Sequence, residues 1–591
     1  MIPGTRLAVT SAYDSAVGIF DLESGEVELL GYHDHLVNRI VVSPDGALAA
    51  SCSSDYSICL WDLRTRRKVM TLLGHSDDVE DFVFADAETG VSASRDWRLL
   101  VWDLRTGAVR RVLEGHQKDV LVLAVAEGRV YSSGDDMTLR VWDLATGEQL
   151  SLIGPFEDET DTCAIDPGRK RAILGCDDGC IRVFDTASGQ ATHVIEAHAS
   201  GIKKVAVSAA TGDILSAAYD QKIVIWDAAT LEARLELDST SATWERSLTW
   251  SPDGAKIVGG TFDGTVLVWD SATGRLESEI GEPGEVPGNP CFNEVAAGPS
   301  GTFVVVSDDG FVRRGRLTPE EGRWECRCEP LSGRILANAV TYDEEYRMVV
   351  TGAHDHTVHI FDSTPAGLER EREVALGEGP INSVRIARHR GYERDVFVAC
   401  YSSAIVRLSP EGEIEGKVSV HEGAVKSLRL HPAKRVGVSC GADGLLLGWS
   451  FEGELLHRYL GHTAIINDVD LEPGGERLAS VSRDFSLKIF ELETGRMQQT
   501  IPIGRKSLKS VCFWSDEVVL VGDYWGGLIR VDLKSESYER AVVAGNGISS
   551  VARCGGHAVL TSYDGAIYLV RPDLAVVRSL RAMHQRLARA A

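Results

Sequence analysis

A short sequence pattern recurs along this chain every 40 to 43 residues, and this period limits the possible folds more than any other property. In each copy, alternating apolar residues end in an aromatic residue and an acid or a related polar group, as in "LLVWDL" around Trp102. A fixed period of this size is typical of folds that repeat one structural unit. The first half of the chain holds seven copies, centred on Phe20, Trp61, Trp102, Trp142, Phe184, Trp226 and Trp269.

The second half continues the same step with weaker copies. Fourteen units in all therefore account for nearly the whole chain of 591 residues, which is longer than a single hydrophobic core usually supports. A segment rich in proline and glycine, "GEPGEVPGNP", separates the two sets and has the composition of an interdomain linker. The copies of the second half lie near Arg314, Phe361, Leu408, Trp449, Phe490, Val531 and Val570.

Each unit contains four short apolar runs separated by turn residues. In "VNRIVVSPDGALAASCSSDYSICLWDL", which begins at Val37, the runs alternate between apolar and polar residues, and "SPDG" and "SSD" have turn composition. Alternation of period two with frequent turns is typical of β-strands, and no long helical pattern interrupts it. The sequence therefore predicts an all-β fold built from four-stranded units.

Four residue types recur inside the units at fixed offsets and raise the question of catalysis. A serine precedes an aspartate by four residues, and an aromatic residue follows that aspartate by six. A hydrolase needs its Ser, His and Asp triad once, whereas this set recurs, so we interpret it as a buried hydrogen-bond network. The complete sets are His33, Ser51, Asp55, Trp61; His75, Ser92, Asp96, Trp102; His116, Ser132, Asp136, Trp142; His198, Ser216, Asp220, Trp226; and His421, Ser439, Asp443, Trp449; a sixth, His462, Ser480 and Asp484, ends in Phe490.

The units resemble WD40 repeats, most specifically in units two to seven. The resemblance implies four-stranded blades arranged as a β-propeller, with the His, Ser, Asp and Trp network stabilising the blades. We therefore expect an all-β fold of two WD40-type seven-bladed propellers in tandem, with fourteen four-stranded blades and a short basic amphipathic C-terminal segment. The expected boundaries are 1–282 for the first propeller, 283–290 for the linker, 291–572 for the second, more divergent propeller and 573–591 for a C-terminal strand or helical tail.

The two ends of the chain depart from the repeat. The segment "RLAVTSAYD" near the start corresponds to the second strand of a unit, so the first blade lacks an innermost strand. Because an open propeller would expose strand edges, we expect that strand to come from the segment after the linker or from the C-terminal tail. In the tail, Val576, Leu580, Met583 and Leu587 recur at helical spacing with arginines between them, which predicts a basic amphipathic segment.

The turns that carry the network aspartates supply the candidate binding residues. Aromatic residues and arginine, which are enriched in binding hot spots, flank these aspartates, and Trp97 stands where the pattern usually has glycine. The acidic run "GHSDDVED" nearby would suit a basic partner, although covering of neighbouring turns and ordinary solvated charge are alternative roles. The candidate partner-binding residues are Tyr56, Asp77, Asp78, Arg95, Trp97, Arg98, Tyr219, Arg483, Phe485, Tyr524 and Trp525.

The net charge, the absence of several motifs and the placement of the cysteines exclude some classes of function. The formal net charge of −26 disfavours binding to a nucleic-acid backbone. The sequence has no glycine-rich phosphate loop, nucleophile elbow, zinc-ligand spacing or long apolar run, so we expect no enzymatic activity, cofactor, metal or membrane span. The 12 cysteines lie mostly in apolar runs, as expected for reduced thiols in a cytoplasmic protein.

These observations predict a cytoplasmic, non-enzymatic interaction scaffold or recognition subunit of a larger assembly. Its partner would be a protein or a basic peptide, bound on the propeller faces or in a cleft between the propellers. Two alternatives remain at this point: a ligand-sensing module of a bacterial signalling or defence system, and an enzyme accessory or metal-dependent propeller.

Overall fold

The computed structural model describes residues 1–11, 15–156, 159–186, 188–238, 243, 245–261, 265–280, 291–317, 324–331, 336–364, 367–388, 391–392, 394–431, 433–504 and 506–581. The chain divides into two compact units, residues 1–285 and 286–591. Apart from the short 3-10 helix η1 (Glu245–Ser247), the secondary structure of the described residues is β-strand. No helix in those ranges has the length and apolar character needed to cross a membrane.

The first unit contains seven antiparallel sheets, each formed by strands that are consecutive in the chain. Its strands, sheet by sheet, are β1 (Leu7–Ser11), β2 (Ala16–Asp21), β3 (Val27–Tyr32); β4 (Val37–Val42), β5 (Leu48–Ser53), β6 (Ser57–Asp62), β7 (Arg67–Leu73); β8 (Val79–Phe84), β9 (Thr89–Ser94), β10 (Arg98–Asp103), β11 (Val109–Glu114); β12 (Val120–Ala126), β13 (Arg129–Gly134), β14 (Leu139–Asp143), β15 (Gln149–Ile153); β16 (Thr160–Asp166), β17 (Arg171–Cys176), β18 (Cys180–Asp185), β19 (Ala191–Glu196); β20 (Ile202–Val207), β21 (Ile214–Ala218), β22 (Ile223–Trp226), β23 (Ala233–Glu236); and β24 (Thr249–Trp250), β25 (Lys256–Gly260), β26 (Val266–Asp270), β27 (Leu276–Ile280).

The second unit repeats this organisation with seven further sheets. Its strands are β28 (Phe292–Ala297), β29 (Thr302–Ser307), β30 (Phe311–Leu317), β31 (Trp324–Pro330); β32 (Ala337–Asp343), β33 (Met348–Ala353), β34 (Thr357–Ser363), β35 (Leu368–Ala375); β36 (Ile381–Ile386), β37 (Val396–Cys400), β38 (Ile405–Leu408), β39 (Ile414–Val418); β40 (Val425–His431), β41 (Val436–Gly441), β42 (Leu446–Ser450), β43 (Leu455–Arg458); β44 (Ile466–Leu471), β45 (Arg477–Ser482), β46 (Ser486–Glu491), β47 (Met497–Pro502); β48 (Leu508–Ser515), β49 (Val518–Asp523), β50 (Gly527–Asp532), β51 (Ser537–Val542); and β52 (Ile548–Cys554), β53 (His557–Ser562), β54 (Ala566–Val570), β55 (Val576–Arg581).

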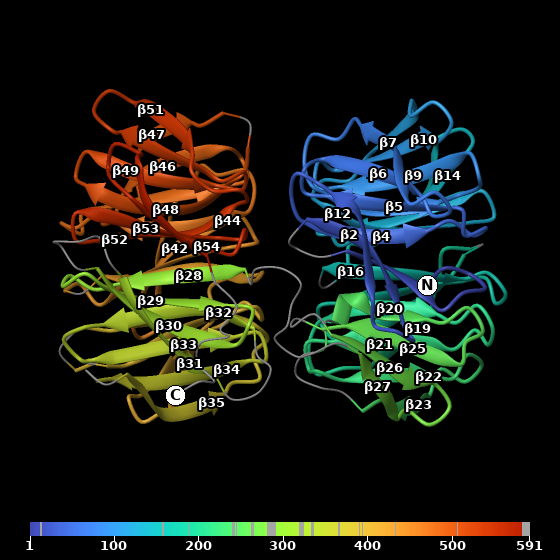
Figure 1. Ribbon diagram of the computed structural model, residues 1–591, viewed down its shortest axis with the longest axis horizontal. Helices are drawn as coiled ribbons and strands as arrows, with labels where there is room; N and C mark the ends of the chain where they lie inside the picture. The colour runs from blue at the N-terminus through green and yellow to red at the C-terminus, as the bar shows by residue number, and fades with distance from the viewer. Residues whose placement is uncertain are drawn as a thin grey trace. The chain divides into compact units, whose positions relative to one another are not determined.

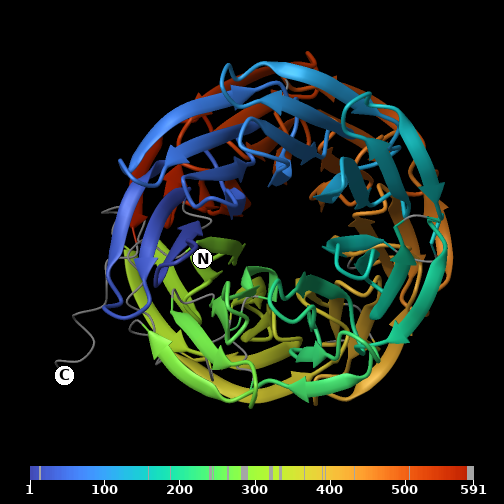
Figure 2. The same ribbon diagram turned by 90° about the vertical axis from the view of Figure 1, so that its right-hand side faces the viewer.

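Within each unit the sheets form the blades of a propeller (Figure 1). Figure 2 looks onto the first unit, where the blades surround a central axis. Neighbouring blades bury apolar side chains between them; one such cluster joins Val91 and Leu99 to Leu123 and Trp142 of the next blade. The fourth strands expose most of their residues, as β11 does, because they lie at the rim. The predicted fold class, an all-β chain with two seven-bladed propellers, is confirmed.

The first blade differs from the prediction. Within the described ranges it has three strands, β1 to β3, and no strand from elsewhere pairs with it, whereas the other thirteen blades have four. In the second unit, by contrast, an apolar cluster that includes Phe292 and Ile567 joins the first and last blades, and Ser549 donates a hydrogen bond to the Phe292 carbonyl. The two segments expected to supply a fourth strand belong to other blades as far as they are described: Phe292–Ala297 forms β28 and Val576–Arg581 forms β55.

The C-terminal segment also differs from the helical expectation. Residues Val576–Arg581 form β55, which pairs with β54 and completes the last blade. Helical and strand periods are hard to tell apart over six residues, and pairing with an existing sheet decides between them. Residues 582–591, with Met583 and Leu587, lie outside the described residues, as does the predicted linker at 283–290.

Candidate functional site

Four polar groups form a continuous hydrogen-bonded chain inside the blade of β8 to β11. The Trp102 indole Nε1 donates to Ser92 Oγ at 2.8 Å, Ser92 Oγ lies 2.7 Å from His75 Nε2, and His75 Nδ1 lies 2.9 Å from Asp96 Oδ2. Pairing of β9 with β10 places Ser92 near Trp102, and the turn between these strands carries Asp96. The chain thus ties a loop, a strand, a turn and the next strand together.

The same chain occurs in all five complete sets. In each, the indole–serine, serine–imidazole and imidazole–carboxylate distances lie between 2.7 and 3.0 Å. In the sixth set His462 keeps its contacts with Asp484 and Ser480, at 2.7 and 2.8 Å. The five serines are fully buried and their oxygens accept from an indole, so this arrangement holds blades together and offers no reachable nucleophile.

Two blades of the first unit lack the network and have other buried residues at its positions. In the blade of β16 to β19, buried Leu174 and Phe184 occupy the serine and tryptophan positions. In the blade of β24 to β27, Gly259 replaces the serine, and the Trp269 indole donates to the Asp238 carbonyl at 2.6 Å. A buried indole N–H thus still finds an acceptor, as such groups generally do.

His33 provides a measurable consequence of the network. Burial opposes its protonation, but the hydrogen bonds and charges of Asp55 and Cys59 outweigh burial and raise the pKa of His33 from 6.5 to about 9. Because the folded pKa exceeds the unfolded one, this stabilisation is complete below pH 6.5 and is lost as the pH rises through 9. In an NMR titration with labelled histidine we expect a midpoint near 9 that falls in Asp55→Asn. A midpoint near 6.5 in the unaltered protein would contradict the pairing.

The turns on the aspartate side of the blades hold an exposed aromatic residue. Trp97 follows Asp96, has a φ of 69° and is 44% exposed. The equivalent turn positions in five other blades hold glycine, also with positive φ: Gly179, Gly310, Gly444, Gly526 and Gly565. A non-glycine residue in this left-handed region carries strain. Seven other blades nevertheless hold one at this position, also with positive φ: Ser15, Tyr56, Met137, Gln221, His356, Ser403 and Phe485. Trp97 differs from these residues in its size and its exposure.

The other predicted binding residues have contacts within their own unit. Arg95 pairs with Glu80 and, at 2.8 Å, with Asp119, and Arg98 donates to Asp96 at 2.8 Å. Among the acidic residues, Asp77 Oδ1 accepts a hydrogen bond from the Asp78 N–H, and the Asp78 carboxylate lies 3.9 Å from Arg95 Nε. The aromatic residues contact cations: the Lys203 ammonium lies 4.8 Å from the centre of the Tyr219 ring, and the Arg483 guanidinium lies 5.7 Å from the centre of the Tyr524 ring. The Lys506 ammonium lies 4.6 Å from the centre of the Trp525 ring.

The structure adds a buried charge cluster that the sequence did not predict. Lys203, fully buried, forms ion pairs with Asp161 and Asp177, and Arg246 contacts Asp161 at 3.1 Å. Burial and the nearby carboxylates raise the pKa of Glu159 to about 7. Lys203 and Asp161 are 42 residues apart, one repeat, so the only signal in the sequence was opposite charge at equivalent positions of consecutive units.

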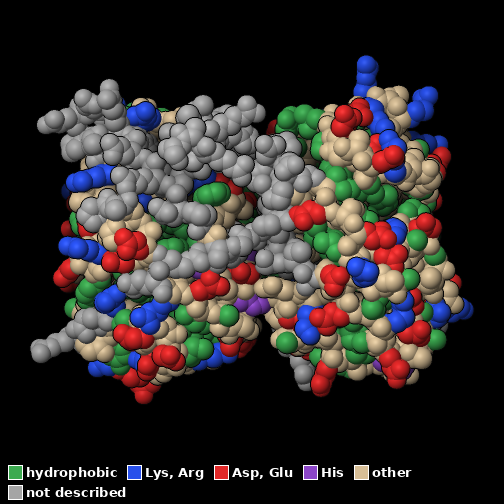
Figure 3. Space-filling view, turned by 60° about the horizontal axis from the view of Figure 1, so that its bottom comes forward, with side chains coloured by type: hydrophobic (Ala, Val, Ile, Leu, Met, Phe, Trp, Pro, Cys, Tyr) green, Lys and Arg blue, Asp and Glu red, His purple; other side chains and the backbone are tan. Residues whose placement is uncertain are grey.

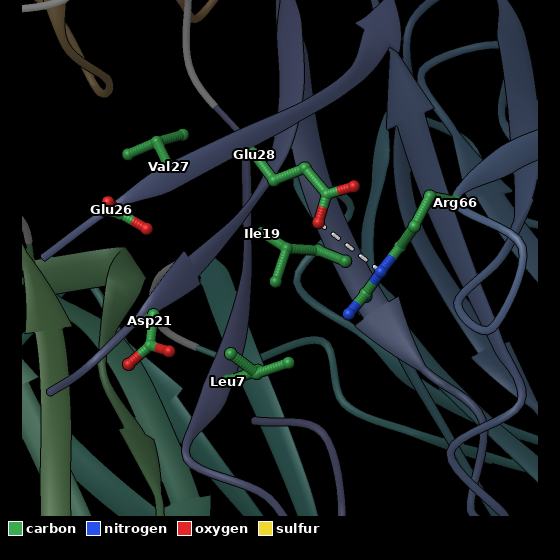
Figure 4. A pocket seen from close by; sticks show the side chains of 7 residues that line it. All are labelled: Leu7, Ile19, Asp21, Glu26, Val27, Glu28 and Arg66. Atoms are coloured by element: carbon green, nitrogen blue, oxygen red, sulfur yellow. Dashed lines mark ion pairs between the residues drawn. The ribbon is translucent and has the colours of Figure 1, made fainter. Parts of the chain in front are cut away.

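The surface of the first unit has no single dominant charge in the view of Figure 3, where acidic and basic side chains are interspersed. A groove of about 570 Å³ is lined by Leu7, Ile19 and Val27, by the ion pair of Glu28 with Arg66, at 3.5 Å, and by two further acidic residues, Asp21 and Glu26 (Figure 4). Within the described ranges, no group of three or more His, Cys, Asp or Glu residues is placed to hold a metal ion.

A family model described as "WD domain, G-beta repeat" matches residues 27–62, 66–103, 107–143, 189–227, 242–270 and 453–491. Autophagy-related protein 16 of Arabidopsis thaliana is 26% identical over 279 residues, 46% of this chain and 47% of that protein. WD repeat-containing protein 37 of Xenopus tropicalis is 33% identical over 233 residues, 38% of this chain and 39% of that protein. Nuclear distribution protein PAC1 of Ajellomyces capsulatus (strain H143) is 30% identical over 277 residues, which are 42% of this chain and 60% of that protein.

This chain thus spans between 39% and 60% of the length of these three relatives. Every matched segment ends at the acid that follows a repeat aromatic residue, such as Asp103 after Trp102, so the matches and the sequence period define the same repeat. Neither the family description nor the relatives' names indicate a catalytic family. The repeated network, the blades and these matches agree: the chain carries WD40 repeats, six of which the family model matches, and contains two seven-bladed propellers in tandem.

Proposed function

We propose that this protein is a non-enzymatic interaction scaffold whose first unit binds a basic protein segment. The binding surface would be the face that carries the turns with the network aspartates, which we call the aspartate-turn face. WD40 propellers mostly serve as rigid interaction platforms, and the WD-repeat relatives support such a role in general. The exposed Trp97 carries the proposal. Its side chain is 44% exposed, whereas the other non-glycine residues at this turn position are buried or only partly exposed, so packing within the blade does not account for it.

The residues near Trp97 in the sequence favour a basic partner. Arg95, two residues before it, lies among three carboxylates, those of Asp78, Glu80 and Asp119, so carboxylates outnumber this arginine. A lysine or arginine of the partner would bind on the Trp97 indole face, which attracts cations. Large aromatic residues with nearby charge are typical of the few positions that dominate binding energy.

The test separates binding from folding by using the strain at Trp97. Peptides selected from a random display library against the unaltered protein should be enriched in lysine and arginine. Trp97→Gly should weaken their binding by about 30-fold, the size expected for a hot spot of about 2 kcal/mol, as measured by fluorescence anisotropy. The same substitution should leave stability unchanged or raise it by up to about 1 kcal/mol, because glycine relieves the positive φ.

Glu127→Gly is the matched control. Glu127 also has a positive φ, 51°, but lies in the turn between β12 and β13, at the opposite end of a neighbouring blade from the aspartate turn. It should show the stability effect without any loss of peptide binding. Selected peptides without basic residues, or equal binding by Trp97→Gly and the unaltered protein, would rule out the proposed face.

A further inference from the structure

The first blade of the first unit differs from its neighbour in one edge. Its β1 pairs with β2 so that Leu7 lies opposite Asp21, just as Leu48 of β5 lies opposite Asp62 of β6. β1 is therefore equivalent to β5, the second strand of the next blade. The other edge of β5 pairs with the innermost strand β4, whereas no strand in the described ranges pairs with the corresponding edge of β1.

The open edge of β1 presents backbone groups that a further strand could use. Leu7 directs its backbone away from β2, because its carbonyl accepts a hydrogen bond from the Ile2 N–H at 2.8 Å and its N–H donates to Thr5 Oγ1 at 3.1 Å. Residues of an antiparallel strand alternate in the direction of their backbone groups. Val9 and Ser11 therefore also direct their N–H and C=O groups to the open edge, where no described residue bonds to them.

The side chains beside this edge are less buried than their counterparts in the neighbouring blades. On β4, Ile40 and Val42 are partly exposed, whereas β8 buries Phe82 and Phe84 at the same positions. Val9 is also partly exposed, and it packs against the same apolar cluster as Ile40 and Val42. Apolar surface beside an unpaired strand edge is a template on which another strand adds.

The innermost strands of the other blades show which residues fit such an edge. The first and fourth residues are both large and apolar in β4, β8, β12, β20, β40 and β44, as Val79 and Phe82 are in β8. The sixth residue of each of these strands is apolar too, as Phe84 is in β8. A strand added to β1 would therefore place apolar residues at these three positions.

The third residue of an innermost strand contacts the next blade. In β8, Asp81 Oδ2 accepts a hydrogen bond at 3.0 Å from the N–H of Leu123, the fourth residue of β12. Ile40 is the fourth residue of β4, and no side chain of the described residues accepts from its N–H. A strand added to β1 would reach this N–H with an acceptor at its third position. The contact recurs at 2.7 to 3.0 Å between other neighbouring blades, where Thr162 accepts from Val205, Glu294 from Val340 and Asp468 from Val511.

We propose that the open edge of β1 binds an extended segment of a partner protein, which adds antiparallel to β1 as the innermost strand of the first blade. The segment has apolar residues at its first, fourth and sixth positions and an aspartate, glutamate or threonine at its third. The two stretches of this chain at 281–290 and 582–591 lack this pattern: the first has Val286 as its single aliphatic residue, and the second has no acid or threonine. The site is separate from Trp97 and takes an apolar, acidic segment instead of a basic one.

A peptide with the sequence of residues 78–86, "DVEDFVFAD", is the probe, because it contains β8 and has the required pattern. Fluorescence anisotropy should show saturable binding of the labelled peptide to the full chain, with one peptide per chain. Hydrogen exchange of the segment that contains Val9 and Ser11, measured by mass spectrometry, should slow when the peptide binds. Trp97→Gly should bind the peptide as the unaltered protein does.

Two N-methylated peptides form a matched pair that tests the strand pairing. In β8 the Ala85 N–H donates to the Thr89 carbonyl of β9, so by alternation the Val83 N–H is also directed to β9 and the Phe84 N–H is directed away. Methylation of the Val83 nitrogen should weaken peptide binding at least about tenfold, because it removes a donor of the ladder. Methylation of the Phe84 nitrogen should leave binding unchanged.

One further peptide and one variant of the protein complete the test. Asp81→Ala in the peptide removes the acceptor for the Ile40 N–H and should weaken binding about tenfold. Val9→Pro in the protein removes a donor from the open edge without touching the pairing with β2, so it should weaken binding at least about tenfold with little change in thermal stability.

Several results would overturn the proposal: no peptide binding, equal effects of the two methylations, or binding that Val9→Pro leaves unchanged. Slow exchange at Val9 and Ser11 before any peptide is added would also overturn it, because a segment of this chain or a second copy would then already pair with β1.

Discussion

Replacing Lys203 by methionine is expected to destabilise the first unit by about 3 to 5 kcal/mol, the usual cost of removing one partner from a buried ion pair. The Lys203 side chain is fully buried, and those of Asp161 and Asp177 are only 4% and 16% exposed. Without the ammonium, two carboxylates remain in a poorly solvated place. Arg246 compensates in part, since it contacts Asp161 at 3.1 Å with a side chain that is 39% exposed.

The pH dependence identifies the cause. Burial alone would raise the pKa of Asp161, but Lys203 and Arg246 hold it at about 2. A depressed carboxyl pKa contributes stability above the unfolded value of 3.8 and loses it as the pH falls through 2. The difference between Lys203→Met and the unaltered protein should therefore be largest at neutral pH and shrink steadily as the pH falls toward 2, because the variant's carboxylate, no longer paired with the ammonium, protonates first.

Native-state hydrogen exchange, measured by mass spectrometry on β16, β17 and β20, gives the local free energy of opening that this prediction needs. Lys222→Met is the control, because Lys222 and Glu236 form a pair at 3.4 Å in which both side chains are more than half exposed. Such exposed pairs contribute about 1 kcal/mol or less. A loss in Lys203→Met no larger than in this control, or one independent of pH, would show that the cluster does not stabilise the unit.

The contrast between Ser92 and Lys203 explains how much of this protein could be predicted from its sequence. Ser92, Asp96 and Trp102 lie within one hairpin, so their spacing fixes their contacts once strands are assumed. The contact of Lys203 with Asp161 joins two neighbouring blades, and each of the two residues is the one that β20 or β16 skips in its pairing with the next strand. A repeat period predicts the number of units, but it does not predict which charges meet between neighbouring blades.

Arg95 and Val576 show two further limits. Arg95 has the composition of a binding residue, yet its guanidinium pairs with Asp119 of the next blade, which local sequence does not reveal. Val576 begins a stretch whose apolar spacing fits a helix, but the open edge of β54 was available for pairing. In both cases a neighbouring element decides the outcome, as is usual when tertiary contacts outweigh local preference.

Removing a network serine should cost nearly as much as removing Lys203. Ser92→Ala leaves the Trp102 indole N–H and the His75 Nε2 without the oxygen that lies 2.8 and 2.7 Å from them, and all three side chains are buried. Buried polar groups left unsatisfied cost about 1 to 3 kcal/mol each, so we expect a loss of about 2 to 4 kcal/mol in the opening free energy of β9 and β10. Ser94→Ala, which removes another buried hydroxyl of β9, should cost about 1 kcal/mol.

A double-mutant cycle tests whether the network, and not simple packing, is responsible. Trp102→Phe removes the indole donor, so adding it to Ser92→Ala should cost about 1 to 2 kcal/mol less than it does alone. The double variant then approaches the blade of β16 to β19, where Leu174 and Phe184 fill these positions without any such bond. Strictly additive losses would mean that the serine and the indole contribute separately. Coupling would show that the recurring Ser, His and Asp set is used to hold each blade together.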